Sequence, residues 1–131
     1  MDRQYTDQAI LLNAAAANGA STPQNFASFR DVELQLATTG FTGVIKFVGS
    51  NADAAPDFAS AASASNPWSY ISTVDQIDGS AIAGGTGISY TTDTSVKNIE
   101  ANTNAFKWVG VIISGYSAGS ITVKAKGVSG I

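Results

Sequence analysis

Alternation of apolar and polar side chains along several short runs is the dominant pattern of this chain. In residues 30–38 every second side chain is apolar, which is typical of a β-strand with one buried face. Residues 43–49 alternate in the same way and lie close enough to the first run for the two to form a hairpin. Residues 119–127 alternate again, and this pattern predicts another strand near the C-terminus.

A second kind of strand is predicted where both faces are apolar. Residues 106–114 fit a central strand covered on each side, with Trp108 in the core. Residues 116–119 then suit a hairpin turn that leads into the last strand. Shorter strands are predicted at 68–74, 87–92 and 95–101, the last with Val96 and Ile99 partly buried.

Two segments lack a clear strand pattern. Residues 50–67 are small and polar and are interrupted by two prolines, which predicts a long loop that lies against something else. Residues 9–17 have helix-forming composition, but Asn18 and Gly19 stop the pattern after about three turns. Residues 1–20 are therefore interpreted as an N-terminal arm or first strand, and residues 21–131 as a single domain.

These elements together predict an all-β fold. Strands with turns every 8 to 12 residues or so, and no full-length amphipathic helix, favour an antiparallel β-sandwich of jelly-roll type with an N-terminal arm. The length of 131 residues suits one hydrophobic core. The order of the strands does not follow from the pattern.

Charge is sparse for a chain of this length. Charged residues make up 13% of the sequence, against about 25% in ordinary soluble domains, and the net charge is −3. The few basic residues are scattered, which argues against nucleic-acid binding. No apolar run is long enough for a membrane span or a signal peptide, so we expect synthesis in the cytoplasm and no membrane partner. Such a surface is either covered by neighbouring proteins or simply neutral and coated with Ser, Thr and Asn.

Catalytic and metal chemistry have little support in the residue types. The chain contains no Cys and no His, so thiol nucleophiles and the commonest proton shuttle and metal ligand are absent. Asp75 and Asp78 could offer oxygen ligands to calcium, but Asp before Gly79 is more often ordinary turn chemistry. We therefore expect no enzyme activity, no cofactor and no bound metal.

Two aromatic residues leave an alternative open. Trp68 and Tyr70 share one face of a predicted strand. They fit core packing, and they also fit a platform on which sugar rings stack. The second interpretation would make the protein a carbohydrate-binding module.

Several of these runs resemble one known group of proteins. The strand signatures at 29–32, 41–47, 68–71, 106–109 and 119–125 are similar to those of small β-sandwich virion proteins of tailed bacteriophages. Within that group, the size and composition look most like capsid decoration, or cement, proteins. The strand signatures do not separate a head protein from a tail or fibre component.

The resemblance implies a structural role on the capsid exterior. A decoration protein clamps adjoining subunits of the major capsid protein from outside, often as a homotrimer. The expected partner interface combines the N-terminal arm, at Asp2, Arg3, Gln4 and Tyr5, with Trp68 and Tyr70. The alternative is a carbohydrate-binding module of a phage tail or fibre, in which Trp68 and Tyr70 would contact the sugar.

Overall fold

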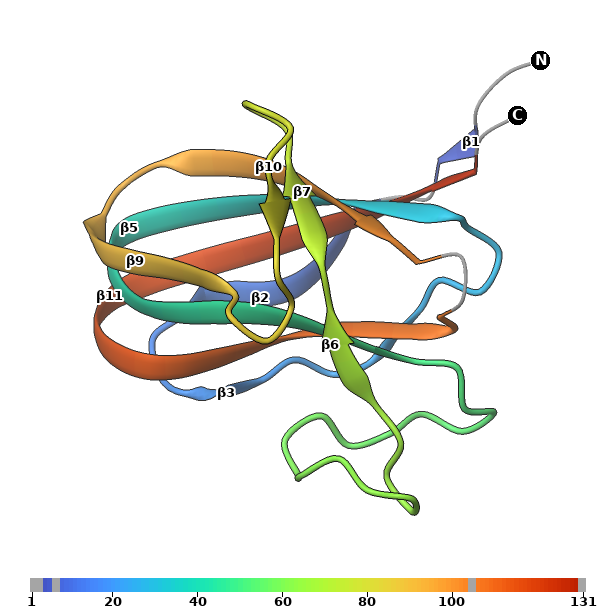
Figure 1. The fold of residues 1–131 in the computed structure, drawn as a ribbon. Helices are drawn as coiled ribbons and strands as arrows, with labels where there is room; N and C mark the ends of the chain where they lie inside the picture. The colour runs from blue at the N-terminus through green and yellow to red at the C-terminus, as the bar shows by residue number, and fades with distance from the viewer. Residues whose placement is uncertain (1–3, 6–7, 104–105, 130–131) are drawn as a thin grey trace.

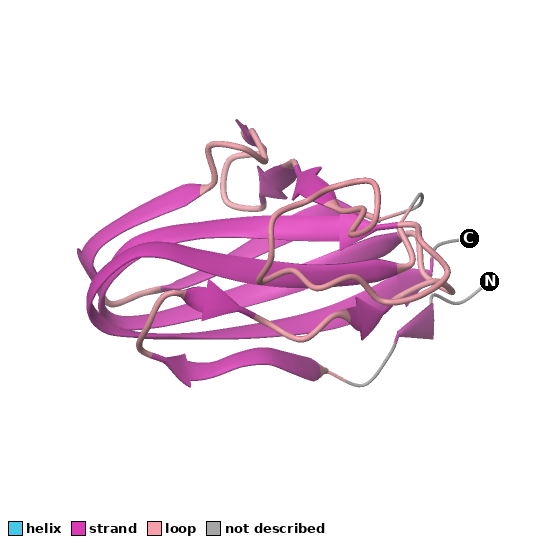
Figure 2. Cartoon of the chain, turned by 90° about the horizontal axis from the view of Figure 1, so that it is seen from below, coloured by secondary structure: helices cyan, strands magenta, loops and turns pink. Residues whose placement is uncertain are grey.

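The computed structural model of this chain describes residues 4–5, 8–103 and 106–129. Within these residues the regular structure is entirely β, in one antiparallel sheet of eleven strands (Figure 2). The strands are β1 (Gln4–Tyr5), β2 (Ala9–Ala15), β3 (Gly19–Ala20), β4 (Gln24–Asn25), β5 (Asp31–Ser50), β6 (Ser69–Ile71), β7 (Thr73–Asp75), β8 (Ala81–Ile82), β9 (Ile88–Asp93), β10 (Val96–Asn102) and β11 (Trp108–Ser129). The predicted all-β, antiparallel class is confirmed.

Two long strands organise the sheet. β5 has 20 residues and β11 has 22, and they pair with each other from Trp108 and Ser50 at one end to Val128 and Asp31 at the other. Each contains two of the runs that the sequence predicted as separate strands. The hairpin predicted between 30–38 and 43–49 is therefore wrong, and so is the hairpin turn predicted at 116–119.

Glycines in the left-handed region explain why these strands bend without reversing. Gly40 in β5, and Gly115 and Gly119 in β11, have φ angles of +56°, +60° and +74°. The β5–β11 register shifts between Ser114 and Ser120, so the strand carries bulged residues there. A bulge bends a strand and increases its twist while the chain keeps its direction. Both strands therefore turn a corner together.

The sheet doubles back on itself at this corner, which lies at the left of Figure 1. The first half of β5 pairs with β10, whereas its second half pairs with β9 and β6. Buried side chains from both halves, such as Leu34 and Phe47, belong to one hydrophobic cluster. The predicted jelly-roll sandwich is not confirmed, because all the strands belong to one continuous hydrogen-bonded sheet.

The edge of β11 that does not pair with β5 pairs instead with the N-terminal strands. β1, β2, β3 and β4 each pair with a different part of β11. The helix-like composition of residues 9–17 is thus overridden, since the segment is too short for a stable helix and pairing with β11 satisfies its backbone. β10 extends the sheet on the other side to β7 and then β8.

Three details of the predicted strands differ from the structure. The run 68–74 divides at Ser72 into β6, which pairs with β5, and β7, which pairs with β10. Val96 is 60% exposed rather than partly buried, whereas Ile99 is fully buried. Trp108 is only half-buried and lies outside the core cluster, because its Nε1 donates to the carbonyl oxygen of Ala52 at 3.0 Å.

Candidate functional site

A row of aromatic rings lies where β6 meets the 51–67 loop. The ring centroids of Phe58 and Trp68 are 6.1 Å apart, and those of Trp68 and Tyr70 are 5.4 Å apart, both in edge-to-face geometry. The Lys46 ammonium lies 5.1 Å from the centroid of the Tyr70 ring. Phe58 is buried, Trp68 is half-buried and Tyr70 is 45% exposed, so the row runs from the interior to the surface.

The loop beside this row is held together by hydrogen bonds, although it contains no strand or helix. The Asn66 Nδ2 donates to the carbonyl oxygens of Asp57 (2.8 Å), Ala61 (3.1 Å) and Ser60 (3.3 Å), and its Oδ1 accepts from the Asp57 amide. The Asp57 carboxylate in turn accepts from Ala59 and Ser60. The loop projects from the sheet at the lower end of Figure 1 and has a defined shape there.

An open hollow of about 580 Å³ lies between this loop and the sheet. Trp68 forms part of its wall. The other lining residues are Gly49, Ser50, Asn51, Ala62, Ser63, Pro67, Ser69 and Phe106. None of them carries a charge, so the hollow combines aromatic surface with neutral hydrogen-bonding groups.

The two aromatic residues singled out in the sequence therefore lie together, but not in the core. Neither Trp68 nor Tyr70 belongs to the buried hydrophobic cluster. The Trp68 Nε1 donates to the carbonyl oxygen of Ser60 at 3.1 Å, which fixes the indole against the loop. Their use as a contact surface remains a prediction.

The N-terminal part of the predicted interface lies elsewhere. Asp2 and Arg3 lie outside the described residues. Gln4 and Tyr5 form β1, which pairs with Ser129 and Val128 of β11. Trp68 and Tyr70 lie instead next to β5. The described residues of the predicted interface therefore lie in or next to strands that pair with different partners, β11 for β1 and β5 for β6.

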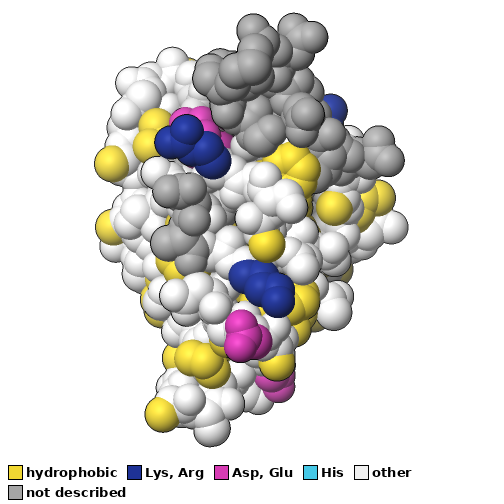
Figure 3. Space-filling view, turned by 90° about the vertical axis from the view of Figure 1, so that its right-hand side faces the viewer, with side chains coloured by type: hydrophobic (Ala, Val, Ile, Leu, Met, Phe, Trp, Pro, Cys, Tyr) yellow, Lys and Arg dark blue, Asp and Glu magenta, His cyan; other side chains and the backbone are white. Residues whose placement is uncertain are grey.

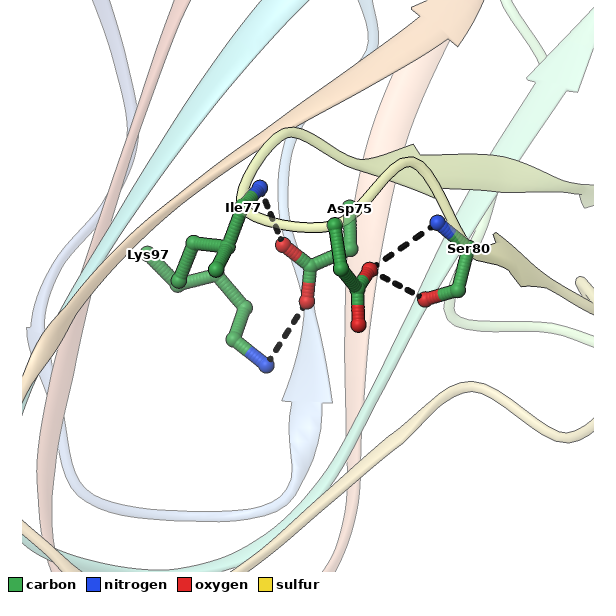
Figure 4. A network of polar contacts seen from close by, with 5 residues as sticks. Asp75, Ile77, Ser80 and Lys97 are labelled. Carbon is green, nitrogen blue, oxygen red and sulfur yellow. Dashed lines mark hydrogen bonds and ion pairs between the residues drawn. The ribbon is translucent and has the colours of Figure 1, made fainter.

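The acidic turn after β7 has a structural explanation (Figure 4). One oxygen of the Asp75 carboxylate accepts from the Ile77 amide at 2.9 Å, and the other lies 3.3 Å from the Lys97 ammonium. Asp78 accepts from both the side-chain hydroxyl and the amide of Ser80, and these bonds lower the pKa of its carboxyl. Among the described residues no three His, Cys, Asp or Glu side chains are grouped as metal ligands would be.

The outer surface shows the sparse charge that the composition predicts. On the face in Figure 3, a few Lys, Arg, Asp and Glu side chains, some of opposite charge next to each other, lie within a larger uncharged area. Several large apolar side chains are exposed; they are Ile10, Tyr70, Val74, Ile77 and Val96. No helix in the described part of the chain is long and apolar enough to cross a membrane.

Three residues of this region were missed by sequence reasoning. Lys46 was assigned only to the outer face of its strand, whereas it covers one face of Tyr70. Asn66 organises the loop, and its position before Pro67 was a usable turn signal. Asn51 gave no signal, because nothing local shows that it lines a hollow.

The fold and this region together define an antiparallel all-β protein with an uncharged hollow beside an aromatic row. Two solved structures share the fold. The SPBc2 prophage-derived protein YomS matches with a TM-score of 0.73 at 15% identity, over 98% of this chain and 96% of that one. The PBSX exported protein XepA matches with a TM-score of 0.74 at 15% identity, over 98% of this chain and 39% of that one.

This chain thus corresponds to nearly all of YomS but to less than half of XepA. No family model matches the sequence, and no curated protein matches it in sequence. At 15% identity the two likenesses show a shared fold.

Proposed function

We propose that this protein is a non-enzymatic structural protein of a bacteriophage, and specifically a capsid decoration protein that bridges subunits of the major capsid protein. The observation that carries the proposal is the match in fold, over nearly the whole of both chains, to a prophage-derived protein. The resemblance of the strand signatures to virion proteins of tailed phages points in the same direction.

The body of the molecule suits a mechanical role. β5 and β11 run through the whole sheet and tie its two folded halves to one core. Such a body resists deformation, because close-packed interiors transmit strain rather than yield to it. A decoration protein would have to hold its shape while the shell beneath it is under pressure.

The surface suits repeated contacts with companions. Ile77 is 77% exposed and Val96 is 60% exposed, and with only 13% charged residues the chain has few charges to keep it monomeric. On a symmetric shell, modest contacts of this kind are repeated at every equivalent position, and linked contacts give high avidity. We place the protein on the capsid exterior as a homo-oligomer, most simply a trimer.

The direct test is binding to capsid shells that lack their decoration protein. We expect the isolated protein to be a trimer by light scattering, or a monomer that becomes trimeric on shells, and to co-sediment with the shells at a fixed ratio. Shells first saturated with unlabelled protein are the control and should retain no labelled protein. A monomer that fails to sediment with bare shells would contradict the proposal.

A second candidate function is carbohydrate binding, as a module of a phage tail or fibre. The specific observation in its favour is that Trp68 is partly exposed in the wall of an uncharged hollow. Ligand sites commonly combine aromatic surface with a few convergent polar groups.

A further inference from the structure

The hollow beside Trp68 has the chemistry of a site for a neutral ligand. Its wall contains one indole, one phenyl ring, one amide and three hydroxyl groups, from Trp68, Phe106, Asn51 and Ser50, Ser63 and Ser69. A phosphate or carboxylate ligand would need a cation or several aimed amides, and a cationic ligand would need a carboxylate. Neither kind of charge lines the hollow.

Some of these polar groups have spare hydrogen-bonding capacity. The hydroxyl of Ser50 is already used, since it donates to the carbonyl oxygen of Pro67 and accepts from the Ala52 amide. Within the described residues, the side chains of Asn51 and Ser69 form no hydrogen bond to the protein. Both are exposed at the hollow. An amide and a hydroxyl can each donate and accept, which matches the hydroxyl groups of a sugar.

The walls are fixed before any ligand arrives. The Trp68 indole is anchored by its hydrogen bond to Ser60 and by edge contact with the buried Phe58 ring. The loop that carries Ala62 and Ser63 is closed by the Asn66 side chain and by paired backbone bonds between Ser63 and Asn66. A site that needs little reordering loses less entropy on binding.

From these observations we propose that the hollow binds a neutral saccharide, with Trp68 as the apolar wall and the side chains of Asn51 and Ser69 as hydrogen-bonding partners. The proposal gives a ligand class and a location to the second candidate function, on which it rests. It is independent of the capsid role. Tyr70 is not among the residues that line the hollow, but its ring contacts the Trp68 ring edge-to-face.

The experiment begins with the full chain on an array of short neutral oligosaccharides, followed by calorimetric titration of the strongest hit. The decisive variants are two neighbouring alanines of the loop, both exposed, of which only Ala62 lines the hollow. Ala62→Glu places bulk and charge in the hollow, whereas Ala61→Glu adds the same charge beside it. Asn51→Ala removes one hydrogen-bonding group.

We expect Ala62→Glu to weaken binding at least tenfold and Asn51→Ala to weaken it about three- to tenfold, as for loss of one hydrogen bond. The affinity of the Ala61→Glu variant should stay within about twofold of that of the unaltered chain. A hit whose affinity is unchanged by Ala62→Glu would overturn this location and leave carbohydrate binding intact. An array with no hit at all would overturn both the location and the second candidate function.

Discussion

Tyr90 is the clearest case of a single residue whose environment changes its chemistry. It lies in β9 with 5% exposure, and its ring packs edge-to-face on Phe41 with centroids 5.7 Å apart. Its hydroxyl is buried and has no hydrogen-bond partner among the described residues. Burial, with smaller contributions from Asp93 and Asp75, raises the pKa of Tyr90 to about 12.

This shift makes stability depend on pH in the alkaline range. A phenol in the unfolded chain ionises near pH 10 or so, whereas Tyr90 in the folded chain keeps its proton until pH is about 12. Between these values the unfolded state binds fewer protons, so stability falls as pH rises. Below the pKa of the phenol in the unfolded chain, Tyr90 is protonated in both states and its contribution to stability is fully present.

We therefore predict that Tyr90→Phe leaves the free energy of unfolding at neutral pH unchanged, or raises it by up to about 1 kcal/mol, because an unpaired buried hydroxyl is removed. Above the ordinary pKa of a phenol, the free energy of unfolding of the variant should also fall less steeply with pH than that of the unaltered chain. Urea denaturation at a series of alkaline pH values measures both effects.

Tyr116→Phe is the matched control, since the Tyr116 hydroxyl donates to the carbonyl oxygen of Gly119 at 2.8 Å. Loss of this hydrogen bond should lower the free energy of unfolding by about 1 kcal/mol. A Tyr90→Phe variant that is less stable than Tyr116→Phe would show that the Tyr90 hydroxyl has a partner.

At the scale of elements, the main lesson concerns β5 and β11. Alternation placed the buried faces of both strands correctly at Leu34, Leu36, Ile121 and Val123. It did not show whether the glycines between two runs reverse the chain or bend it. Gly40 and Gly119 face each other across the corner, and a Cβ on Gly119 would lie 2.2 Å from the carbonyl oxygen of Gly40. The corner depends on this close approach of two backbones.

Two glycines of β11 allow this explanation to be tested. Gly115 and Gly119 have similar positive φ angles, but a Cβ on Gly115 would meet only Val44, at 4.0 Å. Gly115→Ala should therefore lower the free energy of unfolding by about 1 kcal/mol, because alanine disfavours the left-handed backbone conformation. Gly119→Ala should cost about 2 kcal/mol more, because the backbones must separate.

Guanidinium denaturation of the two variants measures the difference. Equal losses of stability would mean that the contact between the two glycines does not shape the corner.

At the scale of the whole molecule, one sheet and one core predict one cooperative transition. β5 and β11 take part in both folded halves, so neither half keeps its pairing if the other unfolds. The 51–67 loop is tied to this body through Phe58, whose side chain is 3% exposed. Small domains with a single core usually unfold in an all-or-none manner.

We predict that the loop region and the sheet unfold together. In a Trp108→Phe variant, the remaining Trp68 reports on the loop by fluorescence, while circular dichroism reports on the sheet. The two denaturation curves should coincide. An earlier transition in the fluorescence of Trp68 would show that the loop opens separately, and would weaken the case for a fixed hollow.

Only part of the candidate site could be predicted from the sequence. The two-residue period of a strand put Trp68 and Tyr70 on one face, and their rings do contact each other. The hollow could not be predicted, because its wall is formed by the end of β5, the 51–67 loop and Phe106. Contacts between segments so distant in the chain follow from the packing of the whole sheet and leave no local pattern.

By itself, the amino-acid sequence determined the all-β class, the buried faces of the runs 30–38, 43–49 and 119–127, and the absence of Cys and His chemistry, since each follows from residue type or local alternation. Tertiary structure alone decided that two expected hairpins are bent strands, that the run 68–74 divides at Ser72, and that Trp68 borders a hollow. The physical reason is that a bend, a change of pairing partner and a hollow are properties of segments brought together, whereas alternation describes only one segment at a time.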